Sequence, residues 1–370
     1  MMEGVDTYLG LKRIHLIWQI LCVAPWKKYK KCYFVWISFV FGLNVVLIST
    51  VVLDIVFCEN LKCLLNNITY YLAVFCKVMQ CLLMVLVRKK LLQLENYFHI
   101  LDGNVTAPED QVLAKNAIEK GQKILKFFFT ITLSAVYSRI SGFLFTSGEM
   151  SILPLWSPFE KYIFIKFLYD CIAGHFIVLQ TVASDMYPPI CFLLLNAHLK
   201  ILSQQLLRIG SGELECHTQS KIAPFVEYHV TILRIYEILD ETLSKMFFVE
   251  LLIASILLCI LTTSVVSTSM ELSELVFNVA FAFALMFQIL PICVLAHQFQ
   301  SLSEDLADAA YSSNWPDQDR AFRRSILLIM HRSQNCKLIL AGGIVPINLP
   351  TFLAILRCAY SFSAIYSMMN

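Results

Sequence analysis

Seven long apolar segments constrain the fold of this 370-residue chain more than any other feature. A helix needs about 20 mainly apolar residues to cross the ~30 Å hydrocarbon core of a bilayer. The segments that meet this length are 32–57, 68–87, 124–145, 162–195, 246–267, 272–295 and 344–369. A backbone inside a bilayer must satisfy its own hydrogen bonds, which favours helices. The sequence therefore predicts an all-α membrane protein with seven transmembrane helices.

The composition agrees with this fold class. Hydrophobic residues make up 58% of the chain and charged residues only 15%, against about 25% in soluble domains. Such a chain is neither disordered nor an ordinary soluble enzyme. Its net charge of +2 gives no general reason to expect a nucleic-acid partner. The thirteen cysteines lie mostly in apolar runs, without zinc-site spacing, so we expect no metal and no cofactor.

The distribution of positive charge predicts the orientation in the membrane. With the N-terminus inside, 23 of the 29 Lys and Arg residues fall in cytosolic segments and three in extracellular ones. The positive-inside rule then places the N-terminus in the cytosol and the C-terminus outside the cell. G-protein-coupled receptors have the opposite topology. This orientation leaves one outward-facing glycosylation candidate, Asn67, in the sequon Asn67-Ile68-Thr69.

Several cytosolic segments have helical patterns. Apolar residues recur at helical spacing in 199–209 and 225–245, and residues 111–126 continue the third span inward. Long helices below the membrane predict a helical cytosolic packing domain. Further on, Trp315-Pro316 is expected to end one helix, and Asp317 or Asp319 to cap the next.

The C-terminal fifth of the chain, from Ser303 to Asn370, resembles the insect odorant receptor family. The segments that carry the resemblance are LSEDLADAAYSSNWPDQDRAFRRSILLIMHRSQ and AGGIVPINLPTFLAILRCAYSFSAIY. The matching positions include Leu306, Ala309, Tyr311, Trp315, Arg323, Arg324, Met330, Arg332, Gln334, Gly342, Pro346, Thr351, Phe352, Tyr360 and Ser361.

The resemblance implies an odorant-gated, non-selective cation channel built as a tetramer around one pore. In this family a tuning subunit binds a small volatile odorant and assembles with a shared co-receptor subunit. The chain looks like a tuning subunit, because it lacks the long insertion between fourth and fifth spans that is typical of the co-receptor. The implied location is the plasma membrane of a sensory neuron, in contact with lipid and permeant cations.

Four regions follow from the spans and the resemblance together. They are a cytosolic segment at 1–31, six spans with a ligand pocket in their outer half at 32–295, a cytosolic subunit-contact region at 296–342, and a pore-lining helix at 343–370. The related gustatory receptor family is the main alternative, although the expected Gln near the end of its last span is missing here. A seven-span transporter is a second alternative. We find no catalytic pair in the spans, so we expect no enzyme.

Candidate pore and subunit-contact residues lie in the last two regions. Ser363, Tyr366, Ser367 and Asn370 add polarity to the last span, although serines in a helix also bond their own backbone. Tyr311, Trp315, Arg323 and Arg324 are candidates for contacts between subunits, with a solvated structural hairpin as the alternative.

The ligand pocket is expected between the second, third, fourth and sixth spans. Volatile ligands need apolar walls with few polar groups. The candidates are the pairs Tyr71 and Phe75, Tyr137 and Ser141, Phe167 and Cys171, and Phe277 and Phe281, each spaced for one helix face, with core packing as the alternative for every member.

Three ionisable residues lie within the outer half of the spans. Lys77, Arg139 and Asp170 are expected at depths of about 13, 9 and 12 Å, at 1.5 Å per helical residue. Buried charges are costly unless they are paired or hydrated. We therefore expect Asp170 to pair with Lys77 or Arg139. Either the pair is purely structural, or one cation, such as Arg139, remains at the pocket wall and favours ligands with an oxygen acceptor.

Overall fold

The computed structural model describes residues 6–25, 30–57, 61–145, 153, 156–157, 161–210, 219–267, 272–335 and 338–369. Helices account for nearly all of the described chain, as predicted. They are η1 (Thr7–Gly10), α1 (Lys12–Ile20), α2 (Lys30–Phe57), α3 (Leu61–Asp102), α4 (Pro108–Phe145), α5 (Ile163–Gly210), α6 (Gln219–Ser267), α7 (Leu272–Ser312), α8 (Arg320–Gln334) and α9 (Leu349–Met369).

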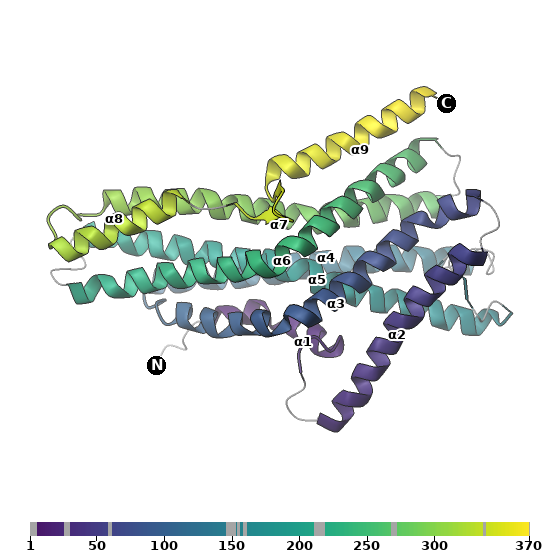
Figure 1. The fold of residues 1–370 in the computed structure, drawn as a ribbon, viewed down its shortest axis with the longest axis horizontal. Coiled ribbons are helices and arrows are strands. Elements are labelled where there is room, and N and C mark those ends of the chain that lie inside the picture. The colour runs from purple at the N-terminus through teal and green to yellow at the C-terminus, as the bar shows by residue number, and fades with distance from the viewer. Residues whose placement is uncertain are drawn as a thin grey trace.

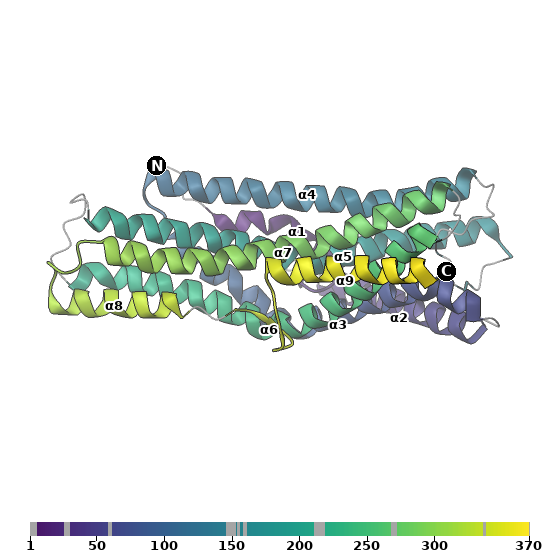
Figure 2. The same cartoon turned by 90° about the horizontal axis from the view of Figure 1, so that it is seen from above.

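Seven of these helices are long and apolar enough to cross a membrane, namely α2 to α7 and α9. The prediction of seven spans is therefore confirmed. Helices α3 to α7 run side by side along the long axis of the molecule, and α8 lies at one end of the bundle (Figure 1; Figure 2). We call that end the anchor end. The C-terminus points towards the opposite half of the molecule (Figure 1).

Five of the spanning helices continue far beyond a bilayer. Helix α6 has 49 residues and α5 has 48, which corresponds to about 70 Å each at 1.5 Å per residue. Their extensions form the anchor end, which confirms the predicted helical packing domain. Helix α5 lies at its centre, because Ile190 and Leu195 are fully buried. Helix α1 packs against α5, where the Trp18 and Tyr187 rings contact each other in a tilted arrangement, with 4.3 Å between ring centroids and an interplanar angle of 40°.

A capped helix follows α7 at the anchor end. Helix α7 ends at Ser312, and the Trp315 indole N–H donates to the Tyr311 carbonyl at 3.2 Å. The Asp319 carboxylate then accepts from the Phe322 backbone N–H at 2.7 Å and caps α8. Of the two predicted capping residues, Asp319 is thus the one used.

The last helix begins later than the sequence suggested. Residues 343–348 were expected to be helical, but Leu340–Ala341 (β1) and Val345–Pro346 (β2) form a small antiparallel hairpin. Gly342 and Gly343 form its turn with φ of +62° and +75°, a region that favours glycine. The Gly342 N–H donates to the Ser244 carbonyl at 2.9 Å, which fixes the hairpin to α6.

Candidate ligand-binding site

An apolar cavity of about 150 Å³ lies among five of the spanning helices. Helices α3, α4, α5 and α7 were expected to form it, and α6 contributes as well. Its lining includes Tyr70, Val74, Lys77, Phe128, Thr132, Val136, Arg139, Leu153, Ile177, Val178, Glu250, Ile253, Ala254, Leu257, Phe277, Phe281, Leu285 and Gln288. Most of this lining is apolar, and its charged members are Lys77, Arg139 and Glu250.

A cation and two aromatic rings form the end farther from the anchor. The Arg139 guanidinium carbon lies 4.2 Å from the Phe277 ring centroid and 5.4 Å from that of Tyr70. The guanidinium also donates to the Tyr70 hydroxyl. The Tyr70 and Phe277 rings stack at 6.0 Å with an interplanar angle of 11°. These contacts hold the guanidinium beside the two rings at the cavity wall.

The end nearer the anchor is a hydrogen-bonded group of six polar side chains from α3, α5, α6 and α7. We call this group the floor network, and its members are Lys77, Gln80, Ser184, Asp185, Glu250 and Gln288. The Lys77 ammonium donates to both Asp185 carboxylate oxygens, at 2.9 and 2.7 Å, and to the Gln80 side-chain oxygen at 2.9 Å. An ammonium has three donors, so these contacts use all of them.

Glu250 is the floor network's second carboxyl group and lines the cavity. Its two oxygens accept from the side-chain amides of Gln288, at 2.9 Å, and Gln80, at 3.3 Å. Only 6% of the residue is exposed. Among the described residues, its side-chain partners are thus neutral amides, whereas Lys77 forms its ion pair with Asp185.

The predicted pairing of Asp170 with Lys77 or Arg139 is wrong. Lys77 pairs instead with Asp185 of α5, at 2.7 Å. Within the described residues Asp170 forms no ion pair, and its carboxylate accepts from the Leu153 backbone N–H at 3.4 Å. Counting residues from helix starts assumed equal starting depths, whereas the helices start at different heights and cross the bundle obliquely (Figure 1).

Three of the nine predicted ligand residues line the cavity, namely Arg139, Phe277 and Phe281. The other six lie outside its lining. Tyr71 is buried and donates to the Asp54 carboxylate of α2 at 2.5 Å. Phe75 and Tyr137 are 51% and 52% exposed.

The remaining three predicted residues, Ser141, Phe167 and Cys171, also lie outside the cavity lining. The Ser141 hydroxyl donates to the Ser138 carbonyl at 2.8 Å. The Phe167 ring packs on Phe143 at 5.1 Å between centroids, and Cys171 is a half-buried thiol.

The sequence interpretation missed two sets of lining residues. On α3 the cavity face carries Tyr70, Val74 and Lys77 at helical spacing, one position away from the predicted Tyr71 and Phe75. On α6 it carries Glu250, Ile253 and Leu257. The criterion that singled out Lys77, an ionisable residue within an apolar segment, also applies to Glu250 and was the available signal.

The predicted pore residues differ in their burial on α9. Ser363 is buried, and its hydroxyl donates to the Thr262 carbonyl of α6 at 3.5 Å. Tyr366 and Ser367 are exposed, and Asn370 lies outside the described residues. Helix α9 packs on α6 and α7 along one side. Its other side exposes large apolar residues, including Tyr360 and Ile365.

The predicted subunit-contact residues lie around the α7–α8 connection at the anchor end. Tyr311 is 70% exposed, Arg323 and Arg324 are exposed, and Trp315 is half-buried. Their side chains therefore remain available to a neighbouring subunit, apart from the packed part of the Trp315 ring.

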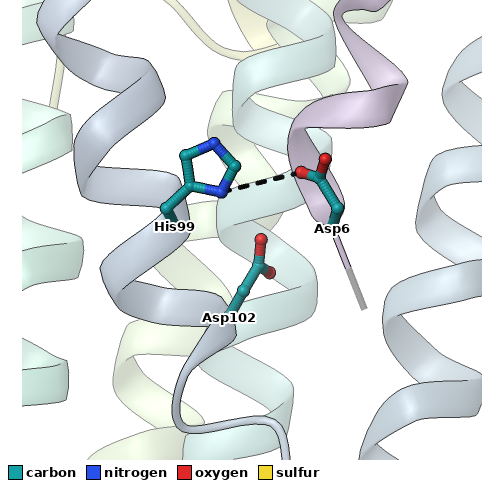
Figure 3. A group of neighbouring side chains, drawn as sticks. All are labelled: Asp6, His99 and Asp102. Carbon is teal, nitrogen blue, oxygen red and sulfur yellow. Dashed lines mark ion pairs between the residues drawn. The ribbon is translucent and has the colours of Figure 1, made fainter. Parts of the chain in front are cut away.

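A small acidic group at the anchor end joins η1 to α3 (Figure 3). Ligand atoms of Asp6, His99 and Asp102 lie within 4.8 Å of one another. Asp102 accepts from the Thr7 backbone N–H at 2.9 Å and from its hydroxyl at 2.8 Å, and Asp6 caps the Tyr8 N–H at 3.1 Å. Both carboxylates therefore have a structural task, and burial raises the pKa of Asp102 to about 6.

Known proteins resemble the chain over most of its length. A family model described as 7tm odorant receptor matches residues 60–360. Odorant receptor 59a of Drosophila melanogaster is 25% identical over 394 aligned residues, covering 99% of this chain and 98% of the relative. Odorant receptor 33a of the same species is 25% identical, covering 74% of this chain and 75% of the relative.

A solved structure shares the fold. The insect olfactory receptor OR5 from Machilis hrabei, in complex with eugenol, superposes with a TM-score of 0.86 at 18% identity, covering 99% of this chain and all of that one. The family match extends over the cavity, the floor network and most of α9. The chain belongs to the 7tm odorant receptor family.

Proposed function

We propose that the chain is the odorant-binding subunit of a heteromeric, odorant-gated, non-selective cation channel. The observation that carries this proposal is the apolar cavity enclosed by α3, α4, α5, α6 and α7. A site of this kind suits a small volatile molecule, because burying apolar surface supplies most of the affinity and a few polar groups fix the orientation. The similar receptor from Machilis hrabei was solved with eugenol bound.

The residues proposed to contact the odorant are those that line the cavity. Phe277, Phe281 and Tyr70 supply aromatic walls, and Arg139 holds two of these rings in place. Val136 and Leu257 supply aliphatic walls. In such a cavity one misplaced methylene changes the binding free energy by about 1–3 kcal/mol, so shape sets much of the selectivity.

Helix α6 is the proposed connection between ligand and pore. It lines the cavity through Ile253 and Leu257, and further along the Thr262 hydroxyl donates to the Ala359 carbonyl of α9 at 3.4 Å. An odorant that binds the open state more tightly shifts the channel towards that state. In this proposal Tyr366, Ser367 and Asn370 border the cation path, and Ser363 positions α9 on α6.

The proposed setting is the plasma membrane of a sensory neuron dendrite, with the anchor end in the cytosol. The positive charge of the cytosolic segments supports this orientation. Tyr311, Trp315, Arg323 and Arg324 would then contact the co-receptor or a second copy. Asn67 remains the glycosylation candidate, and its side-chain amide donates to Asp54 at 3.0 Å. Epitope tags on the two termini of intact cells test the orientation: an N-terminus accessible from the medium would contradict it.

The decisive experiment is heterologous expression with and without an odorant receptor co-receptor. We expect odorant-evoked cation current when both subunits are present at the cell surface, and little when this chain is expressed alone. Silence across a broad volatile panel, despite surface expression with the partner, would contradict the proposed function. Current from this chain alone would contradict the heteromeric assembly.

A further inference from the structure

A second apolar hollow lies between α4 and α7, next to the cavity. It is a groove of about 240 Å³, and its walls include Ile124 and Phe127 of α4 and Leu290 and Val294 of α7. We call it the α4–α7 groove. Because it is larger than the cavity of about 150 Å³, a ligand that fits the cavity also fits the groove.

The groove continues the cavity along one face of α7. The cavity lining on this helix includes Phe281, Ala284 and Gln288, and the groove lining follows with Pro291 and Leu295. These positions are separated by steps of three or four residues, so they share one face of the helix. The two hollows therefore lie one after the other along the same side of α7.

Phe128 is common to both linings. On α4 the groove is lined by Ile124 and Phe128, and the cavity by Phe128, Thr132 and Ala135, again at helical spacing. The residue is only 2% exposed. Since α4 and α7 pack against each other, the Phe128 side chain lies in their shared seam at the point where one hollow ends and the other begins.

The groove lies on a side of the bundle that meets the bilayer. Helix α4 runs along one edge of the bundle (Figure 2). Phe127 lines the groove and is 52% exposed, and its ring packs edge-on against Phe287 at 5.0 Å between centroids. Both residues belong to predicted spans. Lys120 and Gln298, which are exposed, line the groove nearer the anchor end, where a lysine side chain can reach the headgroups.

Helix α7 lacks a backbone hydrogen bond beside this groove. Pro291 lies within the helix and lines the groove. A proline has no N–H, so the carbonyl four residues earlier, that of Phe287, loses its helical donor. Helices bend at such positions. The α7 wall of the seam therefore has a point of bending in the same groove as Phe128.

The opposite end of the cavity is closed by more contacts. There the Tyr70 and Phe277 rings stack, and the Arg139 guanidinium donates to the Tyr70 hydroxyl and lies over the Phe277 ring. A ligand that entered there would have to separate a cation from two rings. At the groove end it would have to displace the single ring of Phe128.

We propose that odorants reach the cavity from the cytosolic leaflet of the bilayer, through the α4–α7 groove, with the Phe128 side chain as the gate. This inference rests on the proposed function, because it concerns how the ligand of that site arrives. Apolar molecules concentrate in lipid by about fourfold for each methylene, so the bilayer supplies them at the mouth of the groove. Entry then needs a rotamer change of Phe128, for which a bend of α7 at Pro291 makes room.

The test uses Val294, which lines the groove and not the cavity. Val294→Trp should obstruct the groove and leave the cavity lining intact. A barrier on the path slows entry and exit equally, because the binding equilibrium depends only on the free and bound states. In rapid perfusion of cells with the co-receptor, current onset and decay after washout should both slow about tenfold, with less than about a twofold change in half-maximal concentration.

Val279→Trp is the matched control, since it makes the same change on α7 at a residue that is 39% exposed and outside both linings. It should leave both rates unchanged. Unchanged rates in Val294→Trp at normal surface expression would overturn the inference. A higher half-maximal concentration without slower washout would overturn it as well, because it reports altered affinity rather than an obstructed path.

A second measurement uses the wild type alone and decides the matter if Val294→Trp fails to reach the surface. A homologous series from the volatile panel, such as straight-chain acetate esters, is applied at known aqueous concentrations. The association rate constant should rise about fourfold per added methylene, following the concentration in the bilayer. A rate constant independent of chain length, as for entry from water, would overturn the inference.

Failure of the route and failure of the proposed function give different results. Odorant-evoked currents whose rates ignore both Val294→Trp and chain length would overturn the route and leave the channel function standing. The absence of current for every volatile tested, with both subunits at the surface, would remove both.

Discussion

The Lys77 ammonium lies 2.7 Å from the Asp185 carboxylate and joins α3 to α5 beneath the cavity. The side chains are 9% and 0% exposed. Removing one member of a buried pair leaves the other charge without compensation, which costs about 3–5 kcal/mol, whereas replacing both by apolar residues is often close to neutral. The pair is therefore expected to govern whether the bundle forms.

The variant Lys77→Met should accordingly lose most of its surface expression and melt at a lower temperature in detergent. The double variant Lys77→Met with Asp185→Leu should recover much of both. Lys90→Met is the control, because Lys90 pairs with Glu241 at 2.8 Å on the surface, where such pairs contribute at most about 1 kcal/mol. If the double variant is as unstable as Lys77→Met, the uncompensated charge of Asp185 is not the cause of the lost stability.

A second prediction separates the cavity face from the outer face of the spans. Phe277→Leu should raise the half-maximal odorant concentration about tenfold, because it removes the ring beneath the Arg139 guanidinium, and such contacts contribute about 1–2 kcal/mol. Phe75→Leu makes the same change at a residue that is 51% exposed and should have little effect. Concentration–response curves with equal surface expression provide the measurement. The reverse order of effects would move the ligand site to the face of α3 that carries Tyr71 and Phe75.

The hairpin before α9 supplies a matched pair of glycine variants. A Cβ at Gly342 would lie 2.8 Å from Cγ of Phe248, and the residue has φ of +62°. At Gly343, with φ of +75°, a Cβ would meet nothing within 4 Å. Gly343→Ala should cost only the backbone strain of about 1–2 kcal/mol, and Gly342→Ala clearly more. Melting temperatures of the two variants check this order, and equal losses would rule out the close approach to Phe248.

The anchor end should become less stable in acid through His198. Burial lowers the pKa of His198 to about 3, from 6.5 in an exposed histidine. Between these values the unfolded chain binds a proton that the folded chain does not, so stability falls as the pH drops through this range. At pH 5 the loss is about 2 kcal/mol. Asp102, whose pKa is raised to about 6, acts in the opposite direction because its folded form holds the proton more tightly.

His198→Gln removes the histidine contribution and keeps a polar side chain next to Tyr228, whose hydroxyl lies 2.8 Å from the His198 ring nitrogen. Between pH 7.5 and 4.5 the melting temperature of the wild type should therefore fall more than that of the variant. If the melting temperatures of the wild type and the variant fall equally over this pH range, His198 is not the group that destabilises the protein in acid.

Hydropathy and charge were enough to predict the helices but not their rotation. Apolar length gave seven spans, and helical spacing gave the long anchor extensions, because both follow from local composition. The choice between Tyr70 and Tyr71 depends on a turn of about 100° around the α3 axis. Apolar residues occupy all sides of such a helix, so the sequence carries little information on which side faces the cavity.

The hairpin and the Lys77–Asp185 pair were missed for a related reason. Both depend on contacts between distant segments, of Gly342 with Ser244 and of α3 with α5. The apolar character of residues 344–348 resembled the start of a span. The contact with the nearby helix α6 explains why the chain forms a hairpin there before α9 begins.

The one-sided packing of α9 has a consequence for the cell. Helix α9 rests on its own subunit along one side and shows Tyr360 and Ile365 on the other, where lipid tails or, in the proposed heteromer, a second subunit would cover them. In that proposed heteromer the number of complete channels in a cell would depend on the supply of the second subunit.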